Sequence, residues 1–489
     1  MRKLLTAATV LVGLASTGLA YGPTGHEIVG GIADKLLANT AAGAQVRALI
    51  DGFTLEKAAV IPDEIKSWDK DGIDDGRAFP HYRDHAKIDK QLREFWQANP
   101  PTHDRNSETP SHHWFHYTDV PVLNAERYSS GRIGRSQWDI VHMIPYCIDV
   151  LRGAIPENNP RKITKPVAVI LLAHYVGDIH QPLHVGAMYF DQASGRAVDP
   201  DKGEAGIEDE GGNTIALRLY HGTPEEMAKR GLKLHGFWDN EAVMANLSLP
   251  PAIPKEQRYE AIEKAKRQLI DQFARAQPAN WRLAANIPLK NYAEAWADEI
   301  LPVAREAHER LQLNNMHAQM EEDRTVAAGT AVEKNVPDRV GYADWTANIV
   351  RDELHKAGWR LADLLSQAVT STTFSAASEP VATPIATQPP GNKIATNSPP
   401  AATATPATGS PFGQYPVNYK EIVTAWLKAN GFDPANVQWQ SEPKPAEVPA
   451  AAGRPLYGYL VIFDSPQASR AKTRSVLIRD GVVISNSGF

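Results

Sequence analysis

Histidines and aspartates at helical spacing are the residues of this sequence best suited to chemistry. His174 and Asp178 lie four positions apart, so on a helix they share one face. They are almost the only polar groups in the apolar run 169–179, and burying an imidazole and a carboxylate is costly unless they pair or bind a metal. Because Pro182 ends the helix, His184 follows just beyond its end and faces the same region. This pattern predicts a metal site on a buried helix.

A second histidine–aspartate pair, His235 and Asp239, has the same spacing. One such pair is compatible with an ordinary hydrogen bond along a helix, whereas two in one chain favour metal binding. Imidazole nitrogen and carboxylate oxygen are ligands that zinc accepts readily. Three further candidates, none of them informative alone, are His26, Asp63 and His116.

The elements that must position these residues are mostly helices. Apolar residues recur with helical periodicity in five stretches, 28–37, 167–179, 259–274, 292–311 and 345–365. Strand signal is scarce, and the segment 214–220 is its best example. We therefore predict one mainly α unit over residues 21–367.

The amino terminus has the three parts of an export signal. A basic start, Met1–Lys3, precedes an apolar run, 4–15, and small residues follow at 18–20, where a signal peptidase would cut. The run is too short for a membrane anchor, and no later segment has the apolar length that a membrane span needs. We expect a signal peptide over residues 1–20, a mature chain that begins at Tyr21, and a secreted or periplasmic protein without stable membrane insertion.

A change in composition divides the rest of the chain. Ala, Pro, Ser, Thr and Gly dominate between positions 371 and 410, and such a segment cannot bury enough apolar surface to offset the entropy of ordering it. We predict a linker over residues 368–414. Beyond it, a helical stretch followed by strand-like stretches predicts a small α+β module over residues 415–489, whose role the sequence does not indicate.

Composition limits the classes of function. The formal net charge of −6 provides no overall attraction to a polyanion, so any phosphate binding must come from a local site. Cys147 is the only cysteine, which excludes an intramolecular disulfide. Its apolar surroundings predict a buried, unreactive thiol rather than a nucleophile.

The order and surroundings of these residues resemble the zinc-dependent single-strand nucleases of fungi, plants and bacteria, the S1/P1 nuclease family. The matching elements are Tyr21–His26, Asp63–Glu64, His116–Asp119, His174–His184, Gly211–Asn213, His235–Asp239 and Gly358–Ala362. Their conjunction is highly specific and covers residues 21–367. The resemblance implies a phospholipase C/single-strand nuclease-like helical domain with a small β-hairpin.

The resemblance also implies three zinc ions per chain. The first would be held by Asp63, His116, His174 and Asp178. The second would be held by His26, Asp178 and the free amino group and carbonyl of Tyr21. The third would be held by His184, His235 and Asp239. Such ions lower the pKa of bound water and thereby supply a nucleophile near neutral pH.

The activity that the resemblance implies is hydrolysis of single-stranded DNA and RNA, and of 3′-nucleotides, to products with 5′-phosphates. Asp63 would orient the nucleophile, and Asn213 and Lys66 would contact the phosphate in the transition state. The family has Arg where this chain has Lys66, and Lys loses the two-pronged contact with phosphate. Tyr117 and Asp119 would form the base pocket, where stacking on an aromatic ring favours unstacked, single-stranded bases.

Three departures from the family pattern bear on substrate and ligation. The segments 69–111 and 185–211 are longer than in the family. The second carries a run of acidic residues, a pattern typical of a solvated loop, which here would repel polyanions and favour shorter substrates. Tyr21 stands where the family usually has Trp, but ligation through main-chain atoms does not depend on the side chain.

Two other functions stay open on the sequence alone. Zinc-dependent bacterial phospholipases C share the fold and nearly the same ligands, although the elements Tyr117–Asp119 and Gly211–Asn213 favour the nuclease. A non-catalytic exported zinc-binding protein would lack a ligand, whereas every ligand position is filled here. The expected substrates are single-stranded nucleic acid and nucleotides, and we predict no protein partner.

Overall fold

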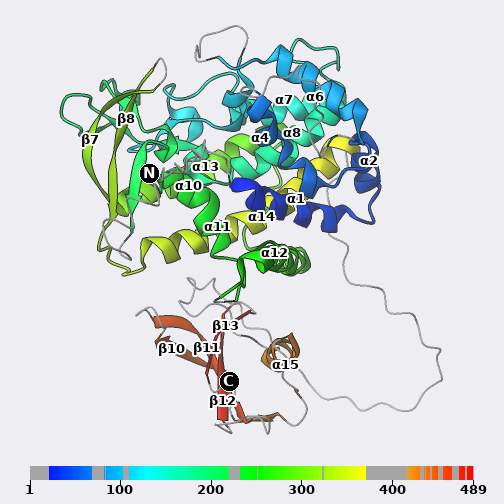
Figure 1. Cartoon of the computed structure of the whole chain (residues 1–489), viewed down its shortest axis with the longest axis vertical. Coiled ribbons are helices and arrows are strands. Elements are labelled where there is room, and N and C mark those ends of the chain that lie inside the picture. Colours follow the sequence, from blue (N-terminus) through cyan, green and yellow to red (C-terminus); the bar gives the residue numbers. More distant parts are fainter. Residues whose placement is uncertain are drawn as a thin grey trace, which may run out of the picture. The chain divides into compact units, whose positions relative to one another are not determined.

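The computed structural model describes residues 21–68, 82, 84–102, 110–219, 232–250, 252–321 and 324–370, and shorter segments between 416 and 487. The chain divides into two compact units, Met1–Glu379 and Pro380–Phe489. The first is built mainly of helices (Figure 1), which confirms the predicted mainly α class. Among the described residues, no helix has both the length and the apolar character required to cross a membrane. The predicted signal peptide, most of the linker and much of the segment 69–111 lie outside the described residues.

Three helices form the centre of the first unit, and two of them carry His26, His174 and Asp178. They are α1 (Gly22–Leu37), α8 (Lys165–Asp178) and α14 (Tyr342–Thr370), and they contact one another. Helix α8 begins where the side chain of Thr164 accepts a hydrogen bond from the amide of Val167, and every residue from Val167 to Asp178 is buried. Sequence periodicity predicts all three helices, although α1 and α14 extend further than expected.

Further helices surround this centre. They are α2 (Ala41–Leu49), α3 (Leu55–Ala58), α4 (Ile61–Glu64), α6 (Ala86–Ala98), α7 (Ile140–Arg152), α10 (Leu234–Gly236), α11 (Ala242–Met244), α12 (Arg258–Arg275) and α13 (Tyr292–Glu309). Short 3-10 turns are η1 (Ile65–Ser67), η2 (His112–His116), η3 (Tyr128–Ser130), η4 (Pro182–His184), η5 (Pro200–Lys202), η6 (Glu210–Gly212), η8 (Lys255–Gln257) and η9 (Leu289–Asn291). Helices α12 and α13 match the predicted helices 259–274 and 292–311 to within two residues at each end.

The first unit also contains a three-stranded sheet with the order β6–β8–β7, of which Figure 1 labels β7 and β8. Its strands are β6 (Ile215–Arg218), β7 (Leu311–Glu321) and β8 (Arg324–Glu333). Strands β7 and β8 form a long antiparallel hairpin, and β6 runs parallel to β8. Periodicity predicts β6 but not the hairpin, because β8 buries three consecutive residues, 326–328, and so lacks the alternation that identifies a strand.

The inserted segment 185–211 folds into short strands. They are β2 (Gly186–Ala187), which pairs with β1 (Val120–Pro121), and β3 (Tyr189–Phe190), which pairs with β4 (Ala197–Val198) and β5 (Ile207–Glu208). Among its acidic side chains Asp199 and Asp209 are buried, and ion pairs with arginines hold Asp201, Glu208 and Glu210. The expectation of a solvated loop is therefore wrong for most of this run, because these side chains are buried or paired with arginines, whereas its expected effect on polyanionic substrates stays a prediction.

The second unit is the small α+β module that the sequence predicts. Its elements are α15 (Tyr419–Ala429), β9 (Gln438–Trp439), β10 (Lys444–Pro449), β11 (Pro455–Asp464), β12 (Thr473–Arg479) and β13 (Val482–Ser487). The strands form an antiparallel sheet, and Val423 and Leu427 of the helix share a core with Val461 and Val476 of the sheet. No group of candidate metal ligands occurs among the residues described here.

Candidate metal centre

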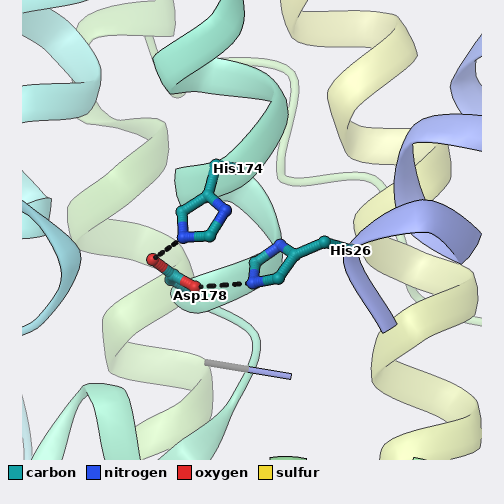
Figure 2. A group of neighbouring side chains, drawn as sticks. All are labelled: His26, His174 and Asp178. Carbon is teal, nitrogen blue, oxygen red and sulfur yellow. Dashed lines mark ion pairs between the residues drawn. The ribbon is translucent and has the colours of Figure 1, made fainter. Parts of the chain in front are cut away.

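Asp178, at the end of α8, lies at the middle of a buried cluster of imidazoles. Figure 2 shows its carboxylate beside the rings of His26 and His174, with Oδ1 3.2 Å from Nε2 of His26 and Oδ2 3.1 Å from Nε2 of His174. Oδ2 is also 3.0 Å from Nδ1 of His116. Asp63 of α4 completes the cluster, with Oδ1 3.6 Å from Nε2 of His174 and 3.9 Å from Nδ1 of His116. The two oxygens of the Asp178 carboxylate thus face different imidazoles, Oδ1 that of His26 and Oδ2 those of His116 and His174.

Local structure fixes the orientation of these rings. His26 extends from α1, and its ring stacks on that of His174 with 3.8 Å between the ring centroids. This approach requires Gly177 on α8, because a Cβ at that position would lie 2.8 Å from Nδ1 of His26. Nδ1 of His174 donates a hydrogen bond to the carbonyl of Ala59 at 2.6 Å. The lone pair of Nε2 is therefore available to a metal.

A second cluster forms where three other predicted ligands meet. Nε2 of His184 lies 3.1 Å from Nε2 of His235, which lies 3.4 Å from Oδ2 of Asp239. Each ring donates through Nδ1 to a main-chain carbonyl, His184 to that of His116 at 2.9 Å and His235 to that of Gly211 at 2.8 Å. Both Nε2 atoms consequently direct lone pairs into the same small space. Facing lone pairs repel one another unless a cation lies between them.

The helical segment that carries His235 and Asp239 is irregular. Helix α10 continues into a π-helical turn, Phe237–Glu241, and then into α11. A π-turn inside a helix is rare and is frequently found at functional sites. The spacing of the two residues predicts that they share a face, but it does not distinguish an α-turn from a π-turn.

Burial keeps most of the imidazoles of both clusters neutral. Burial lowers the pKa of His26, His116 and His184. The pKa of His235 falls to about 3, because burial and the nearby His184 both disfavour its charged form. Neutral imidazole is the form that binds a metal. Burial also raises the pKa of the Asp239 carboxyl, although hydrogen bonds from the Gln181 side chain and the main-chain N–H of Tyr21 oppose this shift. A cation beside Asp239 would favour its ionised form.

The clusters contain buried polar atoms without hydrogen-bond partners, a feature that fits bound metal. Among the described residues these include both ring nitrogens of His26, Oδ1 of Asp178 and Oδ2 of Asp239. Such atoms are rare because leaving them unpaired is costly. The candidate ligand atoms form three groups, each within 4.8 Å: His26, His174 and Asp178; Asp63, His116 and His174; and His184, His235 and Asp239. Nitrogen and carboxylate oxygen together suit zinc.

Three other predicted site residues adjoin these groups. Nζ of Lys66 lies 2.8 Å from Oδ1 of Asp63. Although burial opposes it, this ammonium holds the pKa of Asp63 well below its usual range. Tyr21 directly precedes α1, is fully buried, and stabilises the ionised form of Asp239 through a hydrogen bond from its main-chain N–H. Asn213 is partly exposed, and its amide donates to the carbonyl of Glu210 at 3.0 Å.

The two residues predicted for the base pocket follow His116 in the chain. Tyr117 is partly exposed and has an extended backbone, whereas Asp119 is buried. The main-chain N–H of Asp119 donates to the carbonyl of Gly134 at 2.8 Å, and the Thr118 hydroxyl donates to the same carbonyl at 2.9 Å. The turn that contains Gly134 therefore fixes the main chain of the segment predicted to form the base pocket.

The sequence motifs assign no role to some residues that shape the centre. Gln181 accepts a hydrogen bond from the amide of Leu183 and donates to Oδ1 of Asp239 at 2.9 Å, so it links the helix end to the second cluster. Its place between two predicted ligands of one motif is the signal that could have identified it. The close approach of His26 to Gly177 has no signal in the sequence, since the two residues are far apart in the chain.

A buried ion pair anchors the loop that leads to Asn213. Nε2 of His308 on α13 lies 3.0 Å from Oδ2 of Asp209, and neither side chain is exposed. Nδ1 of His308 donates to the carbonyl of Ala304 at 2.8 Å, so both ring nitrogens are donors and the ring is cationic. Burial opposes this charge, but Asp209 raises the pKa of His308 above its usual value. The carboxylate of Asp209 also accepts a hydrogen bond from the amide of Met188 at 3.0 Å.

Replacing His308 by Gln is expected to lower the free energy of unfolding by about 3–5 kcal/mol, since it leaves a buried carboxylate without its cation. The native pair stabilises the fold fully below the unfolded pKa of about 6.5, and this contribution declines as pH rises through the raised pKa of folded His308. Urea unfolding at several pH values measures both effects. Glu309→Gln, an exposed neighbour, should change stability by less than about 0.5 kcal/mol. Equal stability of His308→Gln and wild type would contradict the prediction.

A mainly helical fold that gathers histidines and aspartates into three adjacent groups defines a candidate multinuclear metal site. The model of the S1/P1 nuclease family matches residues 21–370, and the chain belongs to this family. It is similar to Endonuclease 1 of Arabidopsis thaliana, with 30% identity over 154 residues that cover 28% of this chain and 39% of the plant protein. Endonuclease 5 of the same plant is 25% identical over 265 residues, which cover 52% of this chain and 68% of that protein. The match thus spans less than half the length of Endonuclease 1.

Proposed function

We propose that this protein is a zinc-dependent nuclease that hydrolyses single-stranded DNA and RNA, and 3′-nucleotides, to products with 5′-phosphates. The observation that carries the proposal is the position of Asp178, whose two oxygens face different imidazoles at 3.0–3.2 Å. Metal ions close together are typical of enzymes that cleave phosphodiesters. Membership of the S1/P1 nuclease family supports the same reaction class.

The donor set supports three zinc ions per chain. We assign one to Asp63, His116, His174 and Asp178, a second to His26, Asp178 and the main chain of Tyr21, and a third to His184, His235 and Asp239. When bound, zinc acts as a Lewis acid and lowers the pKa of a bound water. Main-chain carbonyls accept hydrogen bonds from Nδ1 of His174, His184 and His235. These bonds fix each ring so that its Nε2, the proposed ligand atom, points toward the metal site.

The protein groups beside these ligands have distinct proposed roles. Asp63 is ionised at neutral pH because Lys66 lowers its pKa, so it can accept a hydrogen bond from the attacking water and orient it. The Lys66 ammonium, 19% exposed, places a positive charge where phosphate oxygens gain charge in the transition state. The amide of Asn213 is a second donor of the same kind.

Tyr117 and Asp119 are proposed to bind a base beside the cleaved phosphate. Tyr117→Ala should reduce kcat/KM on single-stranded oligonucleotides by the equivalent of about 1–3 kcal/mol, the usual contribution of one base–aromatic stack. Tyr117→Phe should keep most of the activity, because the ring is retained. Steady-state kinetics on one oligonucleotide measure both variants. Unchanged kinetics in the Ala variant would remove Tyr117 from the base pocket.

The phospholipase C function is the second candidate, because its ligands are nearly the same. Purified, processed protein should be assayed in parallel on single-stranded DNA, RNA, 3′-nucleotides and phosphatidylcholine. We expect turnover of the nucleic acids and nucleotides to exceed that of the lipid. Faster turnover of phosphatidylcholine would favour the lipase, and metal binding without any hydrolysis would favour a non-catalytic zinc-binding protein.

We also propose that the protein is exported and that residues 1–20 are its signal peptide. The basic start, the apolar run and the small residues before Tyr21 support this assignment. Mass spectrometry of the amino terminus of protein recovered outside the cytoplasm tests it. A mature chain that retains Met1 would contradict it.

A further inference from the structure

An open pocket of about 300 Å³ lies outside the candidate metal centre. It is lined by Tyr128, Ser129, Gly131, Arg132, Arg135, Ser136, Gln137 and His142. None of these side chains is a carboxylate, and most of them are hydrogen-bond donors. The pocket therefore offers a polar, cation-rich surface in a protein whose net charge is negative.

Arg135 is the most informative residue of this pocket, because its side chain is only 7% exposed. Nε donates to the carbonyl of Tyr128, and Nη1 donates to the carbonyl of Ile133 and to the carboxylate of Asp201 at 2.8 Å. Nη2 has no hydrogen-bond partner among the residues that the structure describes. A buried guanidinium with one unpaired nitrogen is costly to maintain, and a bound acceptor would satisfy it.

His142 provides a second donor to the same pocket. Its Nδ1 lies 2.9 Å from Oδ1 of Asp139, whose Oδ2 accepts a hydrogen bond from the hydroxyl of Tyr128 at 2.6 Å. This contact with Asp139 raises the pKa of His142 above its usual value. The ring is half-exposed, so Nε2 remains available to a ligand. The carboxylate of Asp139 is itself buried and occupied by these partners.

The charge of Arg132 is not compensated locally. Its side chain is exposed, and within the described ranges no carboxylate lies at ion-pair distance from it. The main-chain amides of Arg132 and Ile133 instead donate to Oδ1 of Asp201, at 2.8 and 2.9 Å. Asp201 belongs to the inserted segment 185–211, so this acidic residue holds a basic turn in place.

The same turn contacts the proposed base pocket directly. The carbonyl of Gly134 accepts hydrogen bonds from the main chain of Asp119 and the hydroxyl of Thr118, as described above. Gly134 has φ +72°, and a Cβ there would lie 1.8 Å from the carbonyl oxygen of Asp119, so only glycine allows this contact. The pocket is thus joined to the segment that follows His116.

We propose that this pocket is a subsite for a second phosphate of a single-stranded nucleic acid, one that flanks the nucleotide bound at Tyr117 and Asp119. The inference rests on the proposed nuclease function and adds a determinant of substrate length to it. Guanidinium groups match phosphate oxygens in geometry and charge, and seryl and amide donors beside them complete the shell of a phosphodiester. Oligonucleotides would use the subsite, whereas a 3′-mononucleotide is too short to reach it.

The test compares Arg132→Ala with Arg127→Ala in the full-length, metal-loaded protein. Both remove one exposed arginine from the same loop, but Arg127 does not line the pocket. Arg132→Ala should raise KM for a ten-nucleotide oligothymidylate about 3- to 10-fold at low salt and leave KM for a 3′-mononucleotide within about twofold. The dependence of log KM on log salt concentration should become shallower by about 0.7. Arg132→Lys should return KM for the oligonucleotide most of the way to the wild-type value. Arg127→Ala should have the same KM and the same salt dependence as wild type.

A binding measurement separates this inference from the proposed function. Fluorescence anisotropy with a labelled phosphorothioate oligothymidylate reports affinity without requiring cleavage. If wild type binds the strand more tightly than Arg132→Ala but cleaves nothing, the subsite stands and the nuclease proposal fails. If wild type cleaves both substrates and Arg132→Ala and His142→Gln change neither KM nor affinity, the subsite is overturned. If Arg132→Ala raised KM equally for the mononucleotide and the oligonucleotide, the subsite would also be overturned, since contact with a single phosphate would then explain both results.

Discussion

Asp178→Asn is expected to remove two of the three proposed zinc ions and to lower nuclease activity by at least about 100-fold, more than the loss of an outer-shell partner costs. The reason is that Oδ1 faces His26 whereas Oδ2 faces His116 and His174, so one carboxylate serves two groups. The amide that replaces it carries no charge and has one oxygen instead of two. Elemental analysis of the purified protein, together with an assay on single-stranded DNA, measures both effects.

The residual metal makes this prediction specific. The group of His184, His235 and Asp239 does not include Asp178, so about one ion per chain should remain in the variant. Asp34→Asn is the matched control, because Asp34 is a mostly buried carboxylate whose pKa burial raises to about 6 and which accepts hydrogen bonds from the amides of Leu55 and Glu56. It should keep the metal content and activity of wild type. Three ions and full activity in Asp178→Asn would refute the shared-ligand arrangement.

Extending the amino terminus by even one residue before Tyr21 is expected to cost one zinc ion and most of the activity. A free α-amine has a pKa of about 7.7–8.0, so a metal can displace its proton near neutral pH, whereas an amide nitrogen cannot bind in this way. Two observations support this proposed role: Tyr21 is buried at the start of the helix that carries His26, and its main-chain N–H donates a hydrogen bond to Asp239, which belongs to the neighbouring group. Chains that retain residues 1–20 should behave like the extended ones.

The side chain of Tyr21 supplies the control for this experiment. Its hydroxyl donates to the carbonyl of His180 at 2.7 Å in a fully buried setting. Tyr21→Phe, correctly processed, should therefore lose about 1 kcal/mol of stability but keep its metal and activity. Mass spectrometry of the terminus, metal analysis and a nuclease assay are needed for each sample. Full activity in a chain with a blocked or extended amino terminus would exclude Tyr21 from the ligands.

Local spacing was sufficient to predict the centre of the fold. His174 and Asp178 share a face because a helix repeats every 3.6 residues, and the apolar residues around them require that α8 be buried. The position of His184 just after Pro182 follows from the same local rules. The two contacting helices α1 and α14 were also predictable, since their periodicity lies within single stretches of sequence.

Other features depended on partners that are distant in the chain. The acidic segment 185–211 has the pattern of a solvated loop, yet Arg135 and Arg324 compensate part of its charge. The hairpin of β7 and β8 gives a weak strand signal because its buried residues do not alternate. The ion pairs of the acidic segment join residues that are far apart in the chain. The hairpin pairs neighbouring strands, but its buried residue Ala327 packs against Val122 and Phe190, which no local pattern indicates.

The sequence by itself determined which residues are candidate ligands, that the fold is mainly α, and which family the chain belongs to. These follow from residue type and spacing along single elements, where the physics is local. Tertiary structure alone decided that the oxygens of Asp178 face different imidazoles, that Gly177 admits the ring of His26, and that the turn beside a basic pocket contacts Asp119 through Gly134. Each of these depends on ångström-scale distances between elements, which are set by close packing of the whole core rather than by any one segment.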